Sequence, residues 1–128
     1  MSGYSVNLEA KTQKNSYFRE VLYTTPHSQL VVMSLKSGEE IGMETHDKGD
    51  QFIRVEEGEG EAIIDGQRYP LADGVAVVIP AGAKHNIVNK SSTKPMKLYT
   101  VYSPAEHADG TIHKTKAEAE AAEHHHHG

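Results

Sequence analysis

Short runs of alternating or wholly apolar residues, separated by turn residues, occupy most of the chain. The runs are rich in Val, Ile, Tyr or Thr and cover residues 17–23, 30–35, 51–55, 61–64, 75–79, 85–88 and 98–102. Between two of them, Asp65-Gly66 joins Ile63-Ile64 to Gln67-Arg68-Tyr69, and both turn residues tolerate the positive φ of a tight hairpin turn. Many short strands at a spacing of roughly ten residues predict an all-β sandwich or barrel.

The two ends of the chain lack this pattern. Residues 1–16 are polar and form an N-terminal arm, and residues 17–105 form the barrel domain. Residues 106–123 are a C-terminal extension whose Ala, Glu and Lys residues predict a solvated terminal helix or a disordered tail. Residues 124–128 contain four consecutive histidines and are typical of an expression tag.

Composition and charge exclude several classes of function. The net charge is −5 and the basic residues are scattered, so no electrostatic footprint for nucleic acid is present. The chain shows no signal peptide, no apolar run of the ~20 residues that span a bilayer, and no cysteine. A cytoplasmic protein with no nucleic-acid and no membrane partner is therefore expected.

Four polar side chains fall on otherwise apolar strand faces. Residues two apart on a strand share a face, so Glu44 and His46 project together. Gln51 opens the next strand beyond the turn at residues 47–50, and His85 precedes a further strand. Burying such groups without partners costs several kcal/mol, and a shared cation is the simplest solution. The alternative is that each histidine is a hydrogen-bonded core residue.

The spacing around these four residues resembles the two sequence motifs of the cupin superfamily. The first motif, G-x5-H-x-H-x(3,4)-E-x6-G, is matched by Gly38, Glu44, His46, Gln51 and Gly58. The second, G-x5-P-x-G-x2-H-x3-N, is matched at every specified position by Gly74, Pro80, Gly82, His85 and Asn89. The resemblance implies a double-stranded β-helix, or jelly-roll, barrel. It also implies a metal site of Glu44, His46, Gln51 and His85, and a homodimer. The strand at residues 17–23 is expected at a sheet edge, where pairing with a second copy would cover its backbone groups.

This chain departs from the first motif at two ligand positions. Glu44 stands where the family has its first histidine, and Gln51 stands where the family has glutamate. The carboxylate has changed place, so a divalent ion with one carboxylate and three neutral ligands keeps a net charge of about +1. An amide oxygen in place of an imidazole makes the ligand set harder and favours Zn, Mn, Fe, Ni or Co over Cu(I). Gln51 either binds the ion directly or orients another ligand.

The resemblance leaves three functions open. Two His, one Glu and one Gln are the ligand types of the zinc phosphomannose isomerases, which implies isomerase or lyase chemistry on a metal-bound carbonyl of a small, sugar-like substrate. Two His and one carboxylate are also the ligands of mononuclear iron dioxygenases, and a barrel that only binds metal or sugar is the third possibility. Isomerase or lyase chemistry is the leading interpretation, and no catalytic residue is assigned.

Other polar residues give weaker signals. The chain has three arginines, Arg19, Arg54 and Arg68, and no phosphate clamp is evident. Strands that can line a barrel mouth carry Arg19, Met33, Phe52, Tyr99 and Tyr102, although core packing is the default for the methionine and the aromatic residues. The histidines at positions 27, 107 and 113 have no partner at ligand spacing and stay unassigned.

Overall fold

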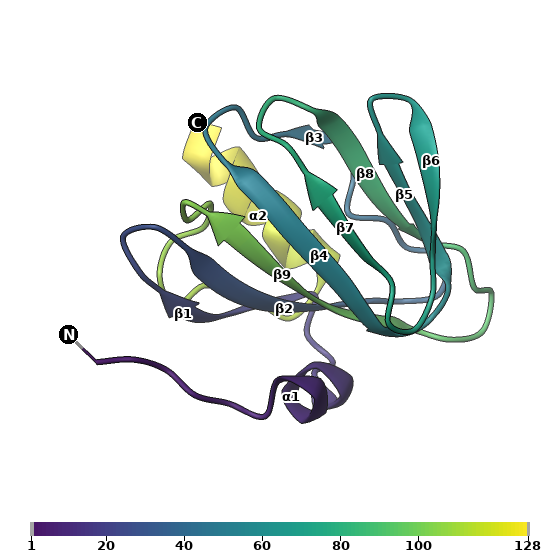
Figure 1. The fold of residues 1–128 in the computed structure, drawn as a ribbon, viewed down its shortest axis with the longest axis horizontal. Coiled ribbons are helices and arrows are strands. Elements are labelled where there is room, and N and C mark those ends of the chain that lie inside the picture. The colour runs from purple at the N-terminus through teal and green to yellow at the C-terminus, as the bar shows by residue number, and fades with distance from the viewer. Residues whose placement is uncertain (1, 128) are drawn as a thin grey trace.

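The protein, described here by a computed structural model, consists of two antiparallel β-sheets that face each other, with one short helix near each end of the chain (Figure 1). The structure describes residues 2–127, with side chains for residues 2–123. The side chains of the terminal histidine run, expected to be a tag, therefore lie outside the described residues. The two-sheet arrangement confirms the predicted jelly-roll fold.

The larger sheet has six strands in the order β10-β1-β2-β9-β4-β7. Their bounds are β1 (Arg19–Thr24), β2 (Gln29–Leu35), β4 (Asp50–Glu57), β7 (Ala76–Ile79), β9 (Met96–Ser103) and β10 (Ile112–His113). Alternate residues of β4 and β9 are buried, as expected for strands with one face on the core.

The smaller sheet has four strands in the order β3-β8-β5-β6. They are β3 (Glu44–Thr45), β5 (Gly60–Ile64), β6 (Gln67–Leu71) and β8 (Lys84–Asn89). The hairpin between β5 and β6 turns at Asp65 and Gly66, both with positive φ, as predicted. The inner faces of the two sheets enclose a core that includes Met33, Ile53, Ile87 and Leu98.

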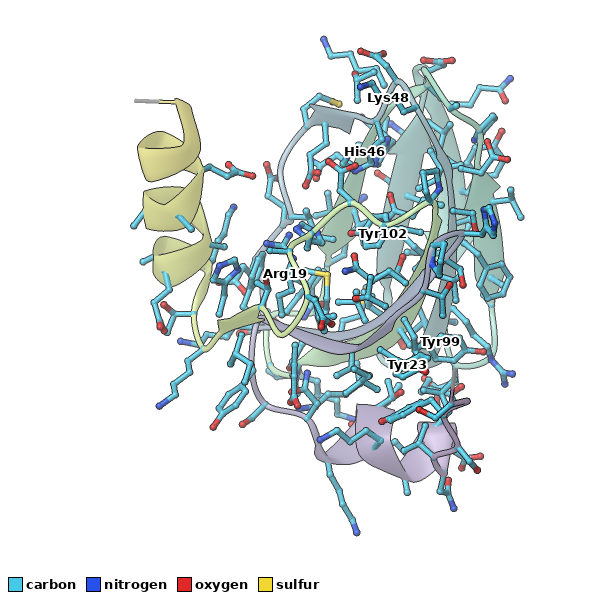
Figure 2. The ribbon with its side chains drawn as sticks, turned by 90° about the vertical axis from the view of Figure 1, so that its left-hand side faces the viewer. Arg19, Tyr23, His46, Lys48, Tyr99 and Tyr102 are labelled. Carbon is cyan, nitrogen blue, oxygen red and sulfur yellow. The ribbon has the colours of Figure 1, made fainter. Side chains whose placement is uncertain are left out.

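Two helices lie on different sides of the barrel (Figures 1 and 2). Helix α1 (Leu8–Lys14) begins at Asn7, whose side chain accepts a hydrogen bond from Ala10 N, and it contacts β2, β4 and β9. The expected polar arm therefore contains a helix that packs on the larger sheet. Helix α2 (Lys116–His127) contacts β10, and its Ala119 is buried. A terminal helix is thus formed where the sequence predicts a helix or a disordered tail.

The neighbours of β1 differ from expectation. The sequence places this strand at a sheet edge, but β10 pairs with its first two residues, Arg19 with His113 and Glu20 with Ile112. The strands that end the larger sheet are β10 and β7, and those that end the smaller sheet are β3 and β6.

Within the described residues, no helix is both long and apolar enough to span a membrane.

Candidate metal centre

Three of the four residues that the sequence predicts as ligands lie together at one end of the barrel. Glu44 on β3 is directly opposite His85 on β8. Its Oε2 atom lies 3.1 Å from His46 Nε2, and the rings of His46 and His85 are 5.1 Å apart. The turn after β3 is held by the main chain, because Gly82 N donates to the carbonyl of His46. His46 lies beside the turn that carries Lys48 (Figure 2).

Glu106, which the sequence does not single out, also contacts His46. Its Oε1 atom lies 3.1 Å from His46 Nδ1, so the imidazole has a carboxylate beside each nitrogen. Buried Gln29 fixes the backbone of this loop: its Oε1 accepts from the N–H groups of Glu106 and His107, and its Nε2 donates to the His107 carbonyl at 2.7 Å. The loop after β9 is thereby held over the open end of the barrel.

The two carboxylates act on the charge of His46. The contact with Glu44 raises the pKa of His46 above its usual value, burial opposes this rise, and the charge of Glu106 adds to it. His46 Nε2 is nevertheless buried without an aligned hydrogen bond, although Glu44 lies at ion-pair distance. The imidazole is therefore held by charge more than by directed hydrogen bonds.

Gln51 lies on β4, buried at 4% exposure, opposite Tyr102 on β9. Its Nε2 donates to Thr100 Oγ1 at 3.0 Å, which fixes the orientation of the amide. Its Oε1 is buried and has no hydrogen-bond partner within the described residues. A buried carbonyl oxygen without a partner is costly, and an oxygen of this kind is a suitable ligand for a hard cation.

His85 is oriented by the backbone. Its Nδ1 lies 3.0 Å from the carbonyl of Ala83 and must carry the hydrogen of that contact, which leaves the lone pair on Nε2. This is the arrangement that metal-binding histidines commonly show, with the second nitrogen held by a carbonyl.

These observations test whether the four side chains fit a metal ion. Among residues 2–123, no three His, Asp or Glu side chains are already arranged as a metal-binding group. Glu44 and His46 pair with each other instead, a contact that ligands would exchange for bonds of about 2.0–2.2 Å to an ion. The unpartnered Gln51 oxygen and the free His85 Nε2 supply the donor atoms that such an ion needs. The residues present therefore fit a divalent cation.

A tyrosine and a histidine continue the site towards the C-terminal loop. The Tyr102 ring meets the His46 ring edge-on, with centroids 5.8 Å apart, and its hydroxyl lies 3.4 Å from His107 Nε2. Burial raises the pKa of Tyr102 far above its usual range. Burial, aided by the charge of Arg19, lowers the pKa of His107 to about 3. At neutral pH Tyr102 and His107 are therefore both uncharged.

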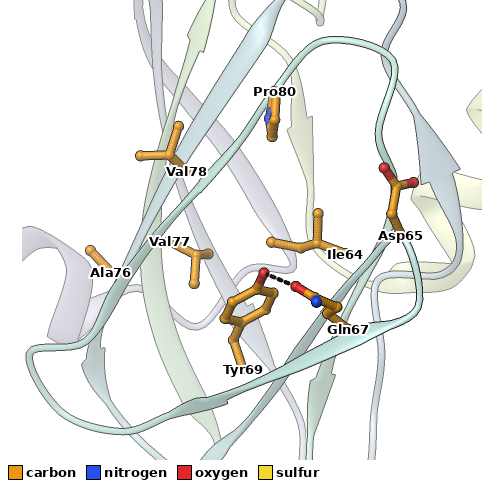
Figure 3. Close-up of a pocket in the computed structure, with 8 residues that line it drawn as sticks. All are labelled: Ile64, Asp65, Gln67, Tyr69, Ala76, Val77, Val78 and Pro80. Carbon is orange, nitrogen blue, oxygen red and sulfur yellow. Dashed lines mark hydrogen bonds between the residues drawn. The ribbon is translucent and has the colours of Figure 1, made fainter.

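A separate cavity of about 550 Å³ lies between β6 and β7, the last strands of the two sheets (Figure 3). Tyr69 and Gln67 line it, and the tyrosine hydroxyl donates to Gln67 Oε1 at 2.7 Å. None of the four expected ligands lines this cavity.

The family model for the cupin domain matches residues 31–102, more than half of the chain, so the chain belongs to the cupin family. Both motifs from Gly38 to Asn89 fall within the matched residues. The crystal structure of BH2720 from Bacillus halodurans superposes with a TM-score of 0.91 at 41% sequence identity, covering 94% of this chain and 95% of that one.

Two curated relatives support the same assignment. An uncharacterized protein of Acanthamoeba polyphaga mimivirus is 47% identical over 112 residues, which are 85% of this chain and 70% of the relative. The uncharacterized protein YrkC of Bacillus subtilis (strain 168) is 43% identical over 126 residues, which are 94% of this chain and 67% of the relative.

Proposed function

We propose that the protein is a metal-dependent enzyme that catalyses isomerase- or lyase-type proton transfer on a small, sugar-like substrate. The observation that carries the proposal is the buried Oε1 atom of Gln51, which has no hydrogen-bond partner within the described residues and comes from one of the four motif positions for ligands. Glu44, His46 and His85 lie at the same end of the barrel and supply one carboxylate and two imidazoles.

In this proposal Glu44, His46, Gln51 and His85 hold one divalent ion of Zn, Mn, Fe, Ni or Co. When bound, such an ion polarises a carbonyl oxygen or lowers the pKa of a bound water molecule. The chain supplies the rest of the site. Ala83 orients His85 through its carbonyl, and Thr100 orients the amide of Gln51.

Glu106 is the group that we assign to proton transfer. Its carboxylate is 41% exposed and adjoins His46, so it is accessible to a substrate at the mouth of the barrel. Tyr102 and His107 do not suit this role. Burial raises the pKa of Tyr102, so it does not lose its proton at ordinary pH, and lowers the pKa of His107 to about 3, so it is a weak base. Glu106 would take a proton from a substrate carbon at one of its carboxylate oxygens and return it to a neighbouring position.

Metal analysis tests the first part of the proposal. A chain ending at Glu123 removes the terminal histidines, and after reconstitution it is expected to hold about one equivalent of divalent metal. Less than about 0.2 equivalents would reject the site. Iron accompanied by oxygen-dependent turnover would favour the dioxygenase alternative instead.

Hydrogen exchange tests the second part. Incubation of the loaded protein with aldoses and ketoses in D₂O is expected to introduce deuterium beside the carbonyl, and Glu106→Gln is expected to abolish it while metal stays bound. Glu9→Gln, on α1, is a matched control for the substitution. Metal binding without exchange on any substrate would favour a binding module over an enzyme.

A homodimer is a further part of this proposal. The edges of β6 and β7 are free to pair with a second copy, and Tyr69 and Val78 expose apolar surface there. Light scattering at micromolar concentration is expected to give twice the chain mass of 14.0 kDa, and a value equal to one chain would contradict the dimer.

A further inference from the structure

Arg19 is a buried cation at the start of β1. It lies between Met33 of β2 and His113 of β10 in the sheet, and it is 4% exposed. It lines a cavity of about 220 Å³ that is bounded by the C-terminal loop and α2. In the view of Figure 2, Tyr102 lies between Arg19 and His46.

The guanidinium of Arg19 has no carboxylate partner within the described residues. Its Nη1 donates to His113 Nδ1 at 3.3 Å, its Cζ lies 5.2 Å from the centre of the Phe18 ring, and its Nε is buried without a partner. None of the ion pairs among the described side chains includes Arg19. An uncompensated buried charge is strongly unfavourable, and a bound anion would relieve it.

The other two arginines of the chain differ from Arg19 because each lies beside a carboxylate. Arg54 Nε lies 3.3 Å from a carboxylate oxygen of Glu56, and Arg68 contacts Glu61. Both are far more exposed, with 43% and 64% of their side chains accessible. The most buried of the three arginines, Arg19, is therefore the one without a carboxylate partner among the described residues.

The cavity beside Arg19 adjoins the candidate metal centre through one residue. Glu106 lines the cavity and also contacts His46. The small side chains of Ala119 and Ala122, on α2, also line the cavity. The volume of 220 Å³ is smaller than the roughly 300–1,000 Å³ of drug-sized sites, which suits a ligand of a few carbon atoms.

We propose that Arg19 binds the carboxylate group of a small organic ligand in this cavity. A carboxylate fits the two-pronged geometry of a guanidinium. A phosphate dianion fits less well, because Glu106 and Glu123 add negative charge to the walls and Arg19 is the single cationic side chain among the lining residues. Thr111 also lines the cavity, and its hydroxyl, which donates to the carbonyl of Ala108, can still accept a hydrogen bond from a hydroxyl group of the ligand. The inference extends the proposed function to a substrate class, but it rests on the cavity and not on a metal.

The test follows the Nε–H group of Arg19 by NMR in the full chain, kept metal-free with a chelator. The three arginines of the chain give three such signals, which single substitutions assign. Titration with acetate, lactate or gluconate is expected to shift the Arg19 signal saturably, whereas lactamide, the neutral analogue of lactate, does not shift it. Isothermal titration calorimetry measures binding in variants that lack this signal: Arg19→Met is expected to weaken binding at least about tenfold, and Arg68→Met to leave it unchanged.

Three outcomes would overturn the proposal. The first is an Arg19 signal that none of the three carboxylates shifts saturably up to about 50 mM. The second is equal binding by Arg19→Met, or by the uncharged polar variant Arg19→Gln if the methionine variant does not fold. The third is a saturable response to inorganic phosphate alone, which would assign the cavity to phosphate compounds. Because the metal is absent throughout, these results are independent of the metal analysis.

Discussion

Two buried amide side chains at opposite ends of the barrel show how differently one functional group is used. Asn89, 1% exposed at the end of β8, donates through Nδ2 to the carbonyls of Leu35, Lys36 and Lys94 and accepts through Oδ1 from Ser91 N. Gln51, 4% exposed on β4, makes one hydrogen bond and leaves Oε1 without a partner.

Both amides belong to the family motifs, so motif membership alone does not identify a site residue. Asn89 links the loop after β2 to the loop between β8 and β9, where the chain also packs tightly: a Cβ atom on Gly60 would lie 2.1 Å from the carbonyl oxygen of Val88. Around Gln51 and His46 the hydrogen bonding is incomplete. The first end stabilises the fold, and the second keeps donor atoms available for a ligand.

The largest effect is expected when the saturated amide is removed. Asn89→Ala removes the two N–H groups that three carbonyls share and one accepted hydrogen bond, which is expected to cost about 3 kcal/mol of unfolding free energy. Gln51→Ala in metal-free protein loses one hydrogen bond to Thr100 and some packing, and is expected to cost about half as much or less. Urea unfolding of both variants measures the difference. Equal losses would remove the distinction between the two ends.

The second-largest expected effect is the stabilisation of the Gln51 end of the barrel by a bound metal ion. An ion that binds only the folded state at ~100 times its dissociation constant adds roughly 2.7 kcal/mol. For a domain of this size that corresponds to an increase of about ten degrees in Tm. His46→Ala and His85→Ala are expected to abolish the increase, and exposed His27→Ala to retain it. An unchanged increase in both site variants would place the ion elsewhere.

Acid is expected to lower the free energy of unfolding through His107, which lies beside Tyr102 at the Gln51 end of the barrel. Because its pKa is lowered to about 3, the unfolded chain takes up a proton between about pH 6.5 and 3 that the folded chain does not. The contribution of His107 to the free energy of unfolding is therefore complete above about pH 6.5. It is lost as pH falls, by up to about 1.4 kcal/mol per pH unit. His107→Gln should flatten the dependence of unfolding free energy on pH, and His27→Gln should not. Parallel profiles for wild type and His107→Gln would contradict this.

The smallest expected change concerns Gln51 itself. Gln51→Glu restores the family carboxylate and brings the net charge of the metal site from about +1 to about 0, so metal should bind about tenfold more tightly. A less positive centre polarises a carbonyl more weakly, so turnover should fall as affinity rises. Metal titrations of both proteins under identical conditions decide between the two roles of Gln51. Affinities within about twofold would indicate that Gln51 only orients another ligand.

Sequence patterns predict the barrel strands and the clustering of Glu44, His46 and His85 well, because strand alternation and motif spacing are local properties. They do not predict Glu106. Its contact with His46 depends on Gln29, on a distant strand, which fixes the loop backbone. The two-residue strand β10 is likewise too short to leave a pattern, and its pairing with Arg19 makes the predicted edge position of β1 wrong.

The loop that carries Glu106 and the helix that bounds the Arg19 cavity follow the last long barrel strand, β9. The motif residues all precede this C-terminal segment, so the loop that carries Glu106 can vary without altering them. Family members with similar motifs but different segments after β9 are therefore expected to differ in the molecules they accept. For protein engineering, the same division makes the segment after Ser103 the first place to alter specificity, with Gln29 retained as its anchor.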